Sequence, residues 1–70
     1  MYRQVHLKKE TEFVTLSETV WIPIKFAVKG IILKIKRNGI WDDGWEVTSV
    51  YSISDAPQTR RHLFGSIEYA

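Results

Sequence analysis

Apolar and polar positions alternate most regularly in the middle of the chain. Within residues 31–36 apolar side chains occupy every odd position, and lysines occupy two of the three even ones. Residues 45–51 repeat the pattern, with Trp45, Val47 and Tyr51 on one face. A period of two is typical of a strand, and both runs are rich in β-branched and aromatic residues. The two runs therefore predict a β-hairpin.

Two dipeptides compete to connect these strands, Asn38-Gly39 and Asp43-Gly44, and either one suits a type I′ turn. A tight turn at the first would place Asp42 opposite Ile35 on the core face, where a carboxylate is costly. A longer connection over residues 37–45 avoids this cost and pairs apolar with apolar residues and base with acid. We therefore predict the longer connection, with Lys36 opposite Glu46, Ile35 opposite Val47, Lys34 opposite Thr48 and Leu33 opposite Ser49.

Three more short strands are predicted outside this hairpin. Residues 5–9 and 13–17 each contain a short alternating run, and the polar residues 10–12 between them suit a turn. At the other end of the chain, Ile67 and Tyr69 alternate with polar neighbours and predict a last strand at the edge of the sheet.

Two segments predict short helical turns. Pro23 cannot donate a hydrogen bond to a sheet, so it indicates a bend or a single helical turn, after which Gly30 suits a positive φ. Ser54 or Asp55 could cap a second helical turn over residues 56–63, with Pro57 in its first turn and Gly65 ending it. Near Pro23 we expect three apolar side chains to point inward and plug one end of a barrel, namely Trp21, Ile24 and Phe26.

The predicted fold is mainly β. Five short strands with one or two short helical turns favour a small five-stranded SH3-like partly open barrel, in a single domain over residues 1–70. A meander sheet with a helix packed on one face is the alternative. A chain of 70 residues hides only roughly 60% of its unfolded surface. Because it contains no cysteine, its stability must come from packing or from a partner.

Charge is segregated along the chain although the formal net charge is only +2. Residues 19–37 contain five bases and no acid, whereas residues 38–59 contain four acids and no base. In the register predicted above, part of this charge is neutralised across the hairpin, and a solvated sheet face explains the strand lysines. No apolar run reaches the ~20 residues of a membrane helix, and the amino terminus lacks the apolar stretch of a signal peptide. We therefore expect a soluble, cytoplasmic protein with no membrane partner.

The candidate site is the stretch "WDDGW", residues 41–45. Asp42, Asp43 and Gly44 favour turn chemistry, with Trp45 facing the core. An exposed Trp41 on such a loop would offer a flat apolar contact, as Trp does in interface hot spots.

The sequence argues against an enzyme. Adjacent carboxylates in a turning chain point apart, which does not suit paired acid and base catalysis. His6 and His62 have no local spacing to metal ligands, and no nucleophile elbow or glycine-rich phosphate loop is present. We therefore expect no catalytic residue, no metal and no cofactor.

A second candidate is the basic stretch Thr59–His62, which contains Arg60 and Arg61. Guanidinium groups suit phosphate or carboxylate, although a solvated helix face or an ion pair with Asp55 or Glu68 also explains them. The candidate binding residues taken together are Arg37, Trp41, Asp43, Trp45, Arg60 and Arg61.

The central pattern W-I-P-x-K-F-A-V-x-G, followed by L-K-I-K and W-x-D-G-W-x-V-x-x-V, covers about residues 20–51. It resembles short uncharacterised proteins of tailed-phage genomes. This resemblance implies a phage accessory protein that acts in the host cytoplasm. It transfers no functional residue, because that family has no assigned activity.

The leading functional prediction is a non-enzymatic binding module that docks an aromatic and charged surface onto a host or phage protein. The alternative is a nucleic-acid-binding barrel that uses five bases, Lys25, Lys29, Arg37, Arg60 and Arg61. A second alternative is an oligomer that binds a small ligand between protomers. A homodimer through an edge strand is compatible with so small a core.

Overall fold

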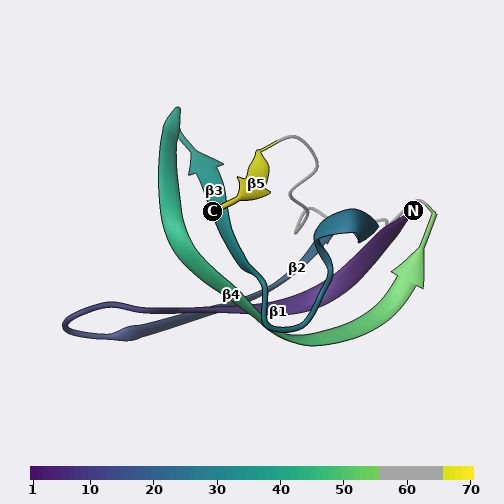
Figure 1. Cartoon of the computed structure of the whole chain (residues 1–70), viewed down its shortest axis with the longest axis horizontal. Coiled ribbons are helices and arrows are strands. Elements are labelled where there is room, and N and C mark those ends of the chain that lie inside the picture. Colours follow the sequence, from purple (N-terminus) through teal and green to yellow (C-terminus); the bar gives the residue numbers. More distant parts are fainter. Residues whose placement is uncertain (56–65) are drawn as a thin grey trace.

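The chain forms one curled antiparallel sheet of five strands (Figure 1). The computed structural model describes residues 1–55 and 66–70. The strands lie in the order β2-β1-β4-β3-β5, and no described pairing joins β2 to β5, so the sheet is not closed. The elements are β1 (Tyr2–Glu10), β2 (Thr15–Pro23), the 3₁₀ turn η1 (Ile24–Phe26), β3 (Ile32–Arg37), β4 (Ile40–Ser54) and β5 (Ile67–Tyr69). The prediction of a mainly β fold with five strands is confirmed.

The first hairpin, β1–β2, is longer than the sequence predicted. Its nine residue pairs run from Tyr2 opposite Pro23 to Glu10 opposite Thr15 without a register shift. Thr11 organises the connection, because its N–H donates to the carbonyl of Val14 over 2.8 Å and its Oγ1 accepts from the N–H of Val14 over 3.0 Å. The turn therefore lies at residues 11–14, not at 10–12.

The second hairpin, β3–β4, corrects the predicted register. Asn38 and Gly39 both have positive φ, at 52° and 80°, which is the geometry of a tight type I′ turn. Ile35 consequently lies opposite Asp42, and Lys36 lies opposite Trp41. The predicted connection over residues 37–45 is wrong, and so are its four pairs, Lys36 with Glu46, Ile35 with Val47, Lys34 with Thr48 and Leu33 with Ser49.

A bulge in β4 explains why the tight turn is tolerated. Ile35 pairs with Asp42 while Leu33 pairs with Trp45, so β4 uses one residue more than β3 over this stretch. Gly44 lies within the bulge at φ 87°, and the added residue brings Trp45 to the core face. The "WDDGW" stretch is therefore part of a strand and not the predicted turn.

Strand β4 bends the whole sheet. Two further register shifts interrupt its pairing with β1, between Arg3 and Val5 and between His6 and Leu7. Bulges bend a strand and increase its twist. Figure 1 shows β4 as one long arc, which pairs with β3 along its first part and with β1 along its second. This arc gives the sheet its concave side.

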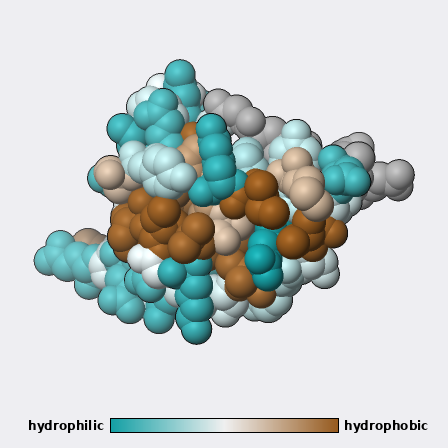
Figure 2. All heavy atoms as spheres, turned by 45° about the vertical axis from the view of Figure 1, so that its right-hand side comes forward, coloured by the Kyte–Doolittle hydropathy of each residue, from teal (hydrophilic) through white to brown (hydrophobic). Residues whose placement is uncertain are grey.

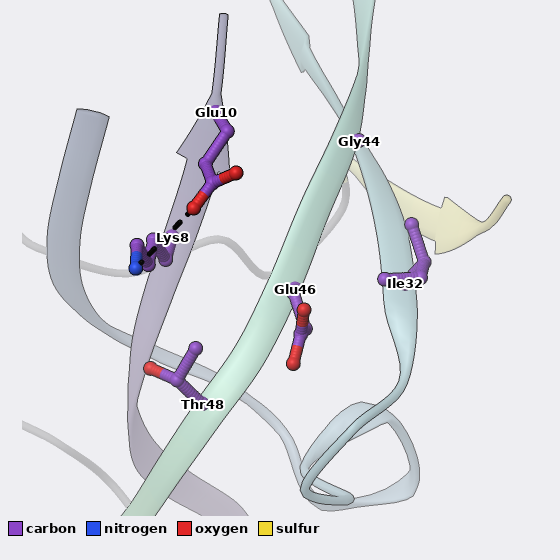
Figure 3. Close-up of a pocket in the computed structure, with 6 residues that line it drawn as sticks. All are labelled: Lys8, Glu10, Ile32, Gly44, Glu46 and Thr48. Atoms are coloured by element: carbon purple, nitrogen blue, oxygen red, sulfur yellow. Dashed lines mark ion pairs between the residues drawn. The ribbon is translucent and has the colours of Figure 1, made fainter. Parts of the chain in front are cut away.

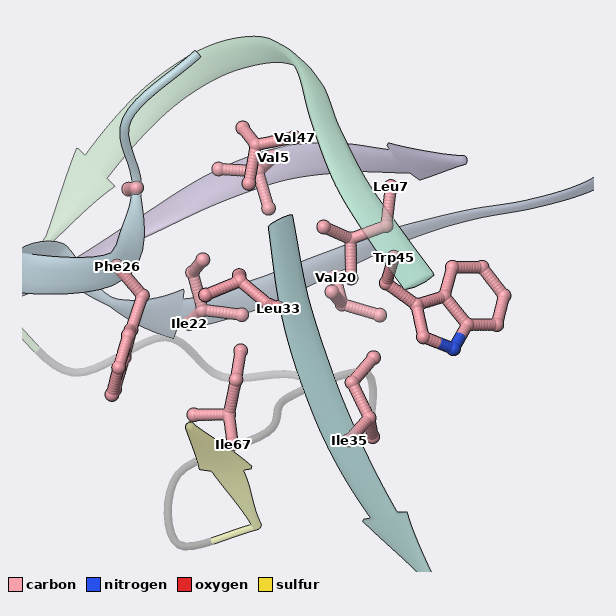
Figure 4. Close-up of a cluster of buried hydrophobic side chains, with 11 residues drawn as sticks. Val5, Leu7, Val20, Ile22, Phe26, Leu33, Ile35, Trp45, Val47 and Ile67 are labelled. Carbon is pink, nitrogen blue, oxygen red and sulfur yellow. The ribbon is translucent and has the colours of Figure 1, made fainter. Parts of the chain in front are cut away.

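The core fills the concave side (Figure 4). Phe26 and Trp45 lie at opposite ends of the labelled cluster in that view. Of the three side chains predicted to plug one end, Phe26 is buried, whereas Ile24 is 39% exposed and Trp21 is half-buried. Alternation along β2 explains Trp21, because its two neighbours point inward. The buried residues are Val5, Leu7, Val20, Ile22, Phe26, Ala27, Leu33, Ile35, Trp45, Val47 and Ile67.

Two further local predictions can be compared with the structure, and a third cannot. The single helical turn after Pro23 is η1, and Gly30 has φ 92°, as expected. Ile67 and Tyr69 form an edge strand, β5, which pairs with β3. The helical turn expected over residues 56–63 lies outside the described residues.

Candidate functional site

The "WDDGW" stretch presents different side chains to the two sides of β4. Asp42 and Trp45 face the concave side, where the indole Nε1 donates to Asp42 Oδ2 over 3.0 Å. Asp43 is exposed, and its Oδ1 accepts from the Gly44 N–H over 2.7 Å. Trp41 precedes them on the outer side. The stretch therefore carries the Trp45–Asp42 hydrogen bond on the concave side and the exposed Trp41 ring on the outer side.

Asp42 is a paired carboxylate, which explains why the core side of the sheet accepts it. Lys9 of β1 forms an ion pair with it, and Trp45 donates the indole hydrogen bond. The hydrogen bond from Lys9, followed by that from Trp45, lowers the pKa of Asp42 below its usual value. The carboxylate is therefore a structural acceptor that stays ionised.

Arg37 spans the open side of the sheet. It pairs with Glu18 of β2, although β4 and β1 separate β3 from β2 in the sheet. Its guanidinium also lies 5.8 Å from the centroid of the Trp45 ring, within the range of a cation–π contact. Arg37 thus covers the Trp45 end of the core and draws the two hairpins together.

Trp41 lies on the outer face of the β3–β4 hairpin. Its side chain is 40% exposed, and the ammonium groups of Lys34 and Lys36 lie 5.3 and 5.9 Å from its ring centroid. Lys34 also pairs with Glu68 of β5 over 3.6 Å. We call these four side chains, Trp41, Lys34, Lys36 and Glu68, the Trp41 surface. It combines an exposed indole with charges of both signs.

The structure separates the residues that the sequence grouped into one candidate site. Trp41 and Asp43 are exposed, but Trp45 is only 4% exposed and belongs to the core. Arg37 contacts Trp45 and Glu18 within the chain. Two members of the predicted set, Arg60 and Arg61, lie outside the described residues. Of the predicted residues in the described part, Trp41 keeps the clearest opportunity to contact a partner.

A hollow of about 330 Å³ lies on the outer face across β1, β4 and β3 (Figure 3). Lys8 and Glu10 at one side form an ion pair of 3.5 Å. Pockets for small molecules are mostly apolar, whereas this open hollow is largely polar. Its lining residues are Lys8, Glu10, Ile32, Gly44, Glu46 and Thr48. In the described part of the chain, no three His, Cys, Asp or Glu side chains gather as a metal site would require.

Sequence reasoning missed the exposed aromatic ring at the tip of the first hairpin. Phe13 is 88% exposed, and the β1–β2 hairpin that carries it extends away from the other strands in Figure 1. Thr11 was the available signal for a turn at this position, because a Thr hydroxyl often bonds to nearby backbone groups in turns. Here the Thr11 hydroxyl bonds to the backbone of Val14. The ring was instead assigned to a strand, since "FVTLS" alternates.

Apolar side chains are also exposed elsewhere on the molecule. Figure 2 shows them gathered across the middle of one face, with hydrophilic side chains around them. Contiguous apolar patches on a small protein mark interaction surfaces more often than isolated residues do. The large exposed apolar residues outside the two hairpin tips are Met1, Leu16, Ile24, Val28, Ile32, Tyr51, Ile53 and Tyr69.

Two observations complete the description of the site. Within residues 1–55 and 66–70, no helix has the length and apolar character needed to cross a membrane. The chain matches no protein-family model, no curated protein and no solved structure.

Proposed function

We propose that this chain is a non-enzymatic binding module that binds a protein partner through the Trp41 surface. The observation that carries the proposal is an indole, 40% exposed, held at the tight-turn end of the β3–β4 hairpin, where Trp41 pairs with Lys36. Trp is enriched among the few residues that dominate binding energy at interfaces. In this proposal the sheet is an SH3-like partly open barrel whose outer face carries the contact.

The surroundings of Trp41 reduce the entropic cost of binding. The tight turn at Asn38-Gly39 fixes the hairpin, and the ammonium groups of Lys34 and Lys36 lie close to the indole ring. Ordering a flexible side chain at an interface costs about 0.5–1.5 kcal/mol, so a ring that is already positioned loses less on binding. This supports a preformed contact rather than one that orders on binding.

The charge balance favours a protein over a nucleic acid. Glu68 pairs with Lys34, Glu18 pairs with Arg37, and Asp43 is exposed on the same hairpin. Lys36 is the one base of the Trp41 surface that forms no ion pair within the described residues. This face therefore offers little unbalanced positive charge. Nucleic-acid affinity depends on several uncompensated phosphate contacts. A mixed surface is better suited to a protein that carries its own charges of both signs.

One observation favours binding of a single-stranded nucleic acid as the second candidate. An indole flanked by two ammonium groups can stack a base while the lysines contact phosphate. Lys25 at η1 does not repeat the combination, because the Phe26 ring that lies 5.0 Å from its ammonium is buried in the core and is only 6% exposed. This candidate requires an affinity that falls steeply with salt.

The test is affinity purification of the tagged protein from bacterial lysate, with and without nuclease. The resemblance to phage proteins motivates that source. Trp41→Ala is compared with Tyr51→Ala, a matched control that removes an aromatic ring 48% exposed on the same strand. We expect one protein to survive nuclease, and its affinity to fall roughly 30-fold or more in the Trp41 variant only.

Three outcomes would contradict the proposal. Retention of the partner by Trp41→Ala, or its equal loss in both variants, would remove Trp41 from the contact. Recovery of nucleic acid without a stoichiometric protein would favour the second candidate instead. Thermal melts of both variants distinguish a lost contact from a lost fold.

A further inference from the structure

The tip of the β1–β2 hairpin carries an aromatic ring that takes no part in the core. Phe13 is 88% exposed, and the hairpin projects away from the other strands (Figure 1). Val14 beside it is 55% exposed, and Leu16 at the start of β2 is 42% exposed. Apolar side chains scattered singly on a surface are ordinary, whereas a cluster of them indicates a contact with another molecule. The tip is therefore a candidate interaction site.

The turn that holds the ring is fixed before any partner binds. The Thr11 hydroxyl donates to the Val14 carbonyl over 2.8 Å and accepts from the Val14 N–H over 3.0 Å. The Thr11 N–H donates to the same carbonyl, and the paired strands β1 and β2 support the turn without a register shift. A ring on a preformed turn loses less conformational entropy on binding than a ring on a flexible loop.

Carboxylates surround the exposed ring. Glu12 lies directly before it, is itself exposed, and forms no ion pair among the described residues. Glu10 is 74% exposed and pairs with Lys8 over 3.5 Å, whereas Lys9 is paired with Asp42 on the concave side. The tip thus keeps a negative charge around an apolar centre. Complementary potentials meet across protein interfaces, so this arrangement matches a pocket that is apolar inside and basic at its rim.

We propose that the hairpin tip docks into an apolar pocket with a basic rim on a protein partner, with Phe13 as the inserted side chain. Glu12 and Glu10 then face lysines or arginines at the rim of that pocket. An aromatic side chain at the desolvated centre of an interface, within a polar rim, is a recurrent source of binding energy. The tip and the Trp41 surface belong to different hairpins, so either contact can exist without the other.

The charges of the tip favour a protein over two other occupants. Anionic lipid surfaces attract basic segments, so two carboxylates beside Phe13 oppose its insertion into a membrane. The outer hollow of a second copy does not fit the tip either, because it carries the carboxylates of Glu10 and Glu46. The Trp41 surface of a second copy presents an exposed ring instead of a pocket. A membrane and a second copy are therefore outcomes that the test must distinguish.

The first experiment places the photo-crosslinking residue p-benzoylphenylalanine at position 13 of the full chain, expressed in bacteria. We expect it to cross-link one protein, at a segment that contains apolar residues and at least one Lys or Arg. The same residue at position 51 is the matched control, because Tyr51 is 48% exposed on β4. Glu12→Lys should lower the yield from position 13 roughly fivefold or more. Asp55→Lys makes the same change in net charge at another exposed acid and should leave the yield unchanged.

The second experiment measures the affinity of the purified chain for the cross-linked protein. Phe13→Ser should raise the Kd roughly tenfold or more, whereas Tyr51→Ser should leave it unchanged. Circular dichroism verifies that both variants fold. Vesicles of phosphatidylcholine and phosphatidylglycerol are the probe for a membrane, and we expect the chain not to sediment with them.

Four results overturn the proposal: no protein cross-linked above the level of position 51, a cross-link to a second copy, vesicle binding that Phe13→Ser abolishes, or a yield that Glu12→Lys leaves unchanged. An equal Kd for Phe13→Ser and wild type overturns it as well, so capture of a protein is not sufficient support. The same cross-linker at position 41 separates the two proposed contacts. Cross-linking from position 41 alone leaves the proposed function standing and removes this site, and cross-linking from position 13 alone does the reverse.

Discussion

Asp42 offers the sharpest test of how the sheet tolerates a carboxylate on its concave side. Its Oδ1 accepts from Lys9, and its Oδ2 accepts from the indole of Trp45. Asp42→Asn keeps the size of the side chain and an oxygen that can still accept from the indole, but it removes the charge. We expect the variant to fold with reduced stability.

The magnitude follows from the exposure of the pair. The side chains of Lys9 and Asp42 are 22% and 37% exposed, so solvent screens their attraction, and the ion pair contributes about 0.5–1 kcal/mol. A hydrogen bond to a charged acceptor exceeds one to a neutral acceptor, and replacing the carboxylate should weaken the Trp45 bond by roughly 0.5 kcal/mol. The expected loss is about 1–1.5 kcal/mol, and each kcal/mol corresponds to about 4–8 °C in Tm for a domain of this size.

The loss should depend on pH in a defined direction. The pKa of Asp42 is lowered in the folded state, so its contribution to stability is complete above the unfolded pKa of about 3.9. As the pH falls through the lower folded pKa, the folded protein takes up the proton and that contribution is lost. The stability difference between wild type and Asp42→Asn should therefore be present near neutral pH and disappear in strong acid.

Urea denaturation at a series of pH values measures this difference. Asp43→Asn is the control, because Asp43 is exposed and its amide oxygen can still accept from Gly44, so its effect should stay within about 0.5 kcal/mol. Equal stability of Asp42→Asn and wild type near neutral pH would refute the reasoning. A difference that persists in strong acid would refute it too.

Three further substitutions separate backbone, core and surface. Gly44→Ala should cost roughly 1–2 kcal/mol in urea denaturation, because φ is 87° while the added methyl has space, with Lys9 Cε nearest at 3.9 Å; an unchanged midpoint would contradict the bulge. Leu33→Ala should lose about 2–5 kcal/mol, because Leu33 is fully buried. Phe13→Ser should stay within about 0.5 kcal/mol in the same urea denaturation, since Phe13 is 88% exposed; a large loss would place its ring in a packed contact.

Local pattern was sufficient for what depends on neighbouring residues. The period of two located β1, β3 and the middle of β4, but only the first three residues of β2. Pro23 indicated the 3₁₀ turn, and the alternation of Ile67 and Tyr69 indicated β5. The burial of Trp45 also followed from its place in an alternating run. These features rest on side-chain period and backbone restriction, which a few residues specify.

The predicted register of the second hairpin was wrong because the stability of each register depends on contacts with residues distant in the sequence. The argument against the Asn38-Gly39 turn assumed that Asp42 would lack a partner on the core face. Lys9 supplies that partner from 33 residues away, and the bulge that turns Trp45 inward supplies a second. A cost assigned to one residue in isolation cannot include partners that the fold itself brings into contact. The exposure of Phe13 was missed for a local reason, because alternation alone does not show where a hairpin turns, although Thr11 marked the turn.

The segregated charges of the sequence show how pairing across the fold bears on the choice between the two proposed partners. The basic block and the acidic block suggested opposite patches, or else pairing with each other along one hairpin. The structure instead pairs Arg37 with Glu18 and Lys34 with Glu68, both acids from outside the acidic block. These pairs leave little unbalanced positive charge around Trp41, so the exposed indole is the main feature that this face offers. A phosphate backbone would gain little binding energy from a surface with so little unbalanced positive charge. A protein partner could bind the indole in a pocket and also contact the paired charges around it.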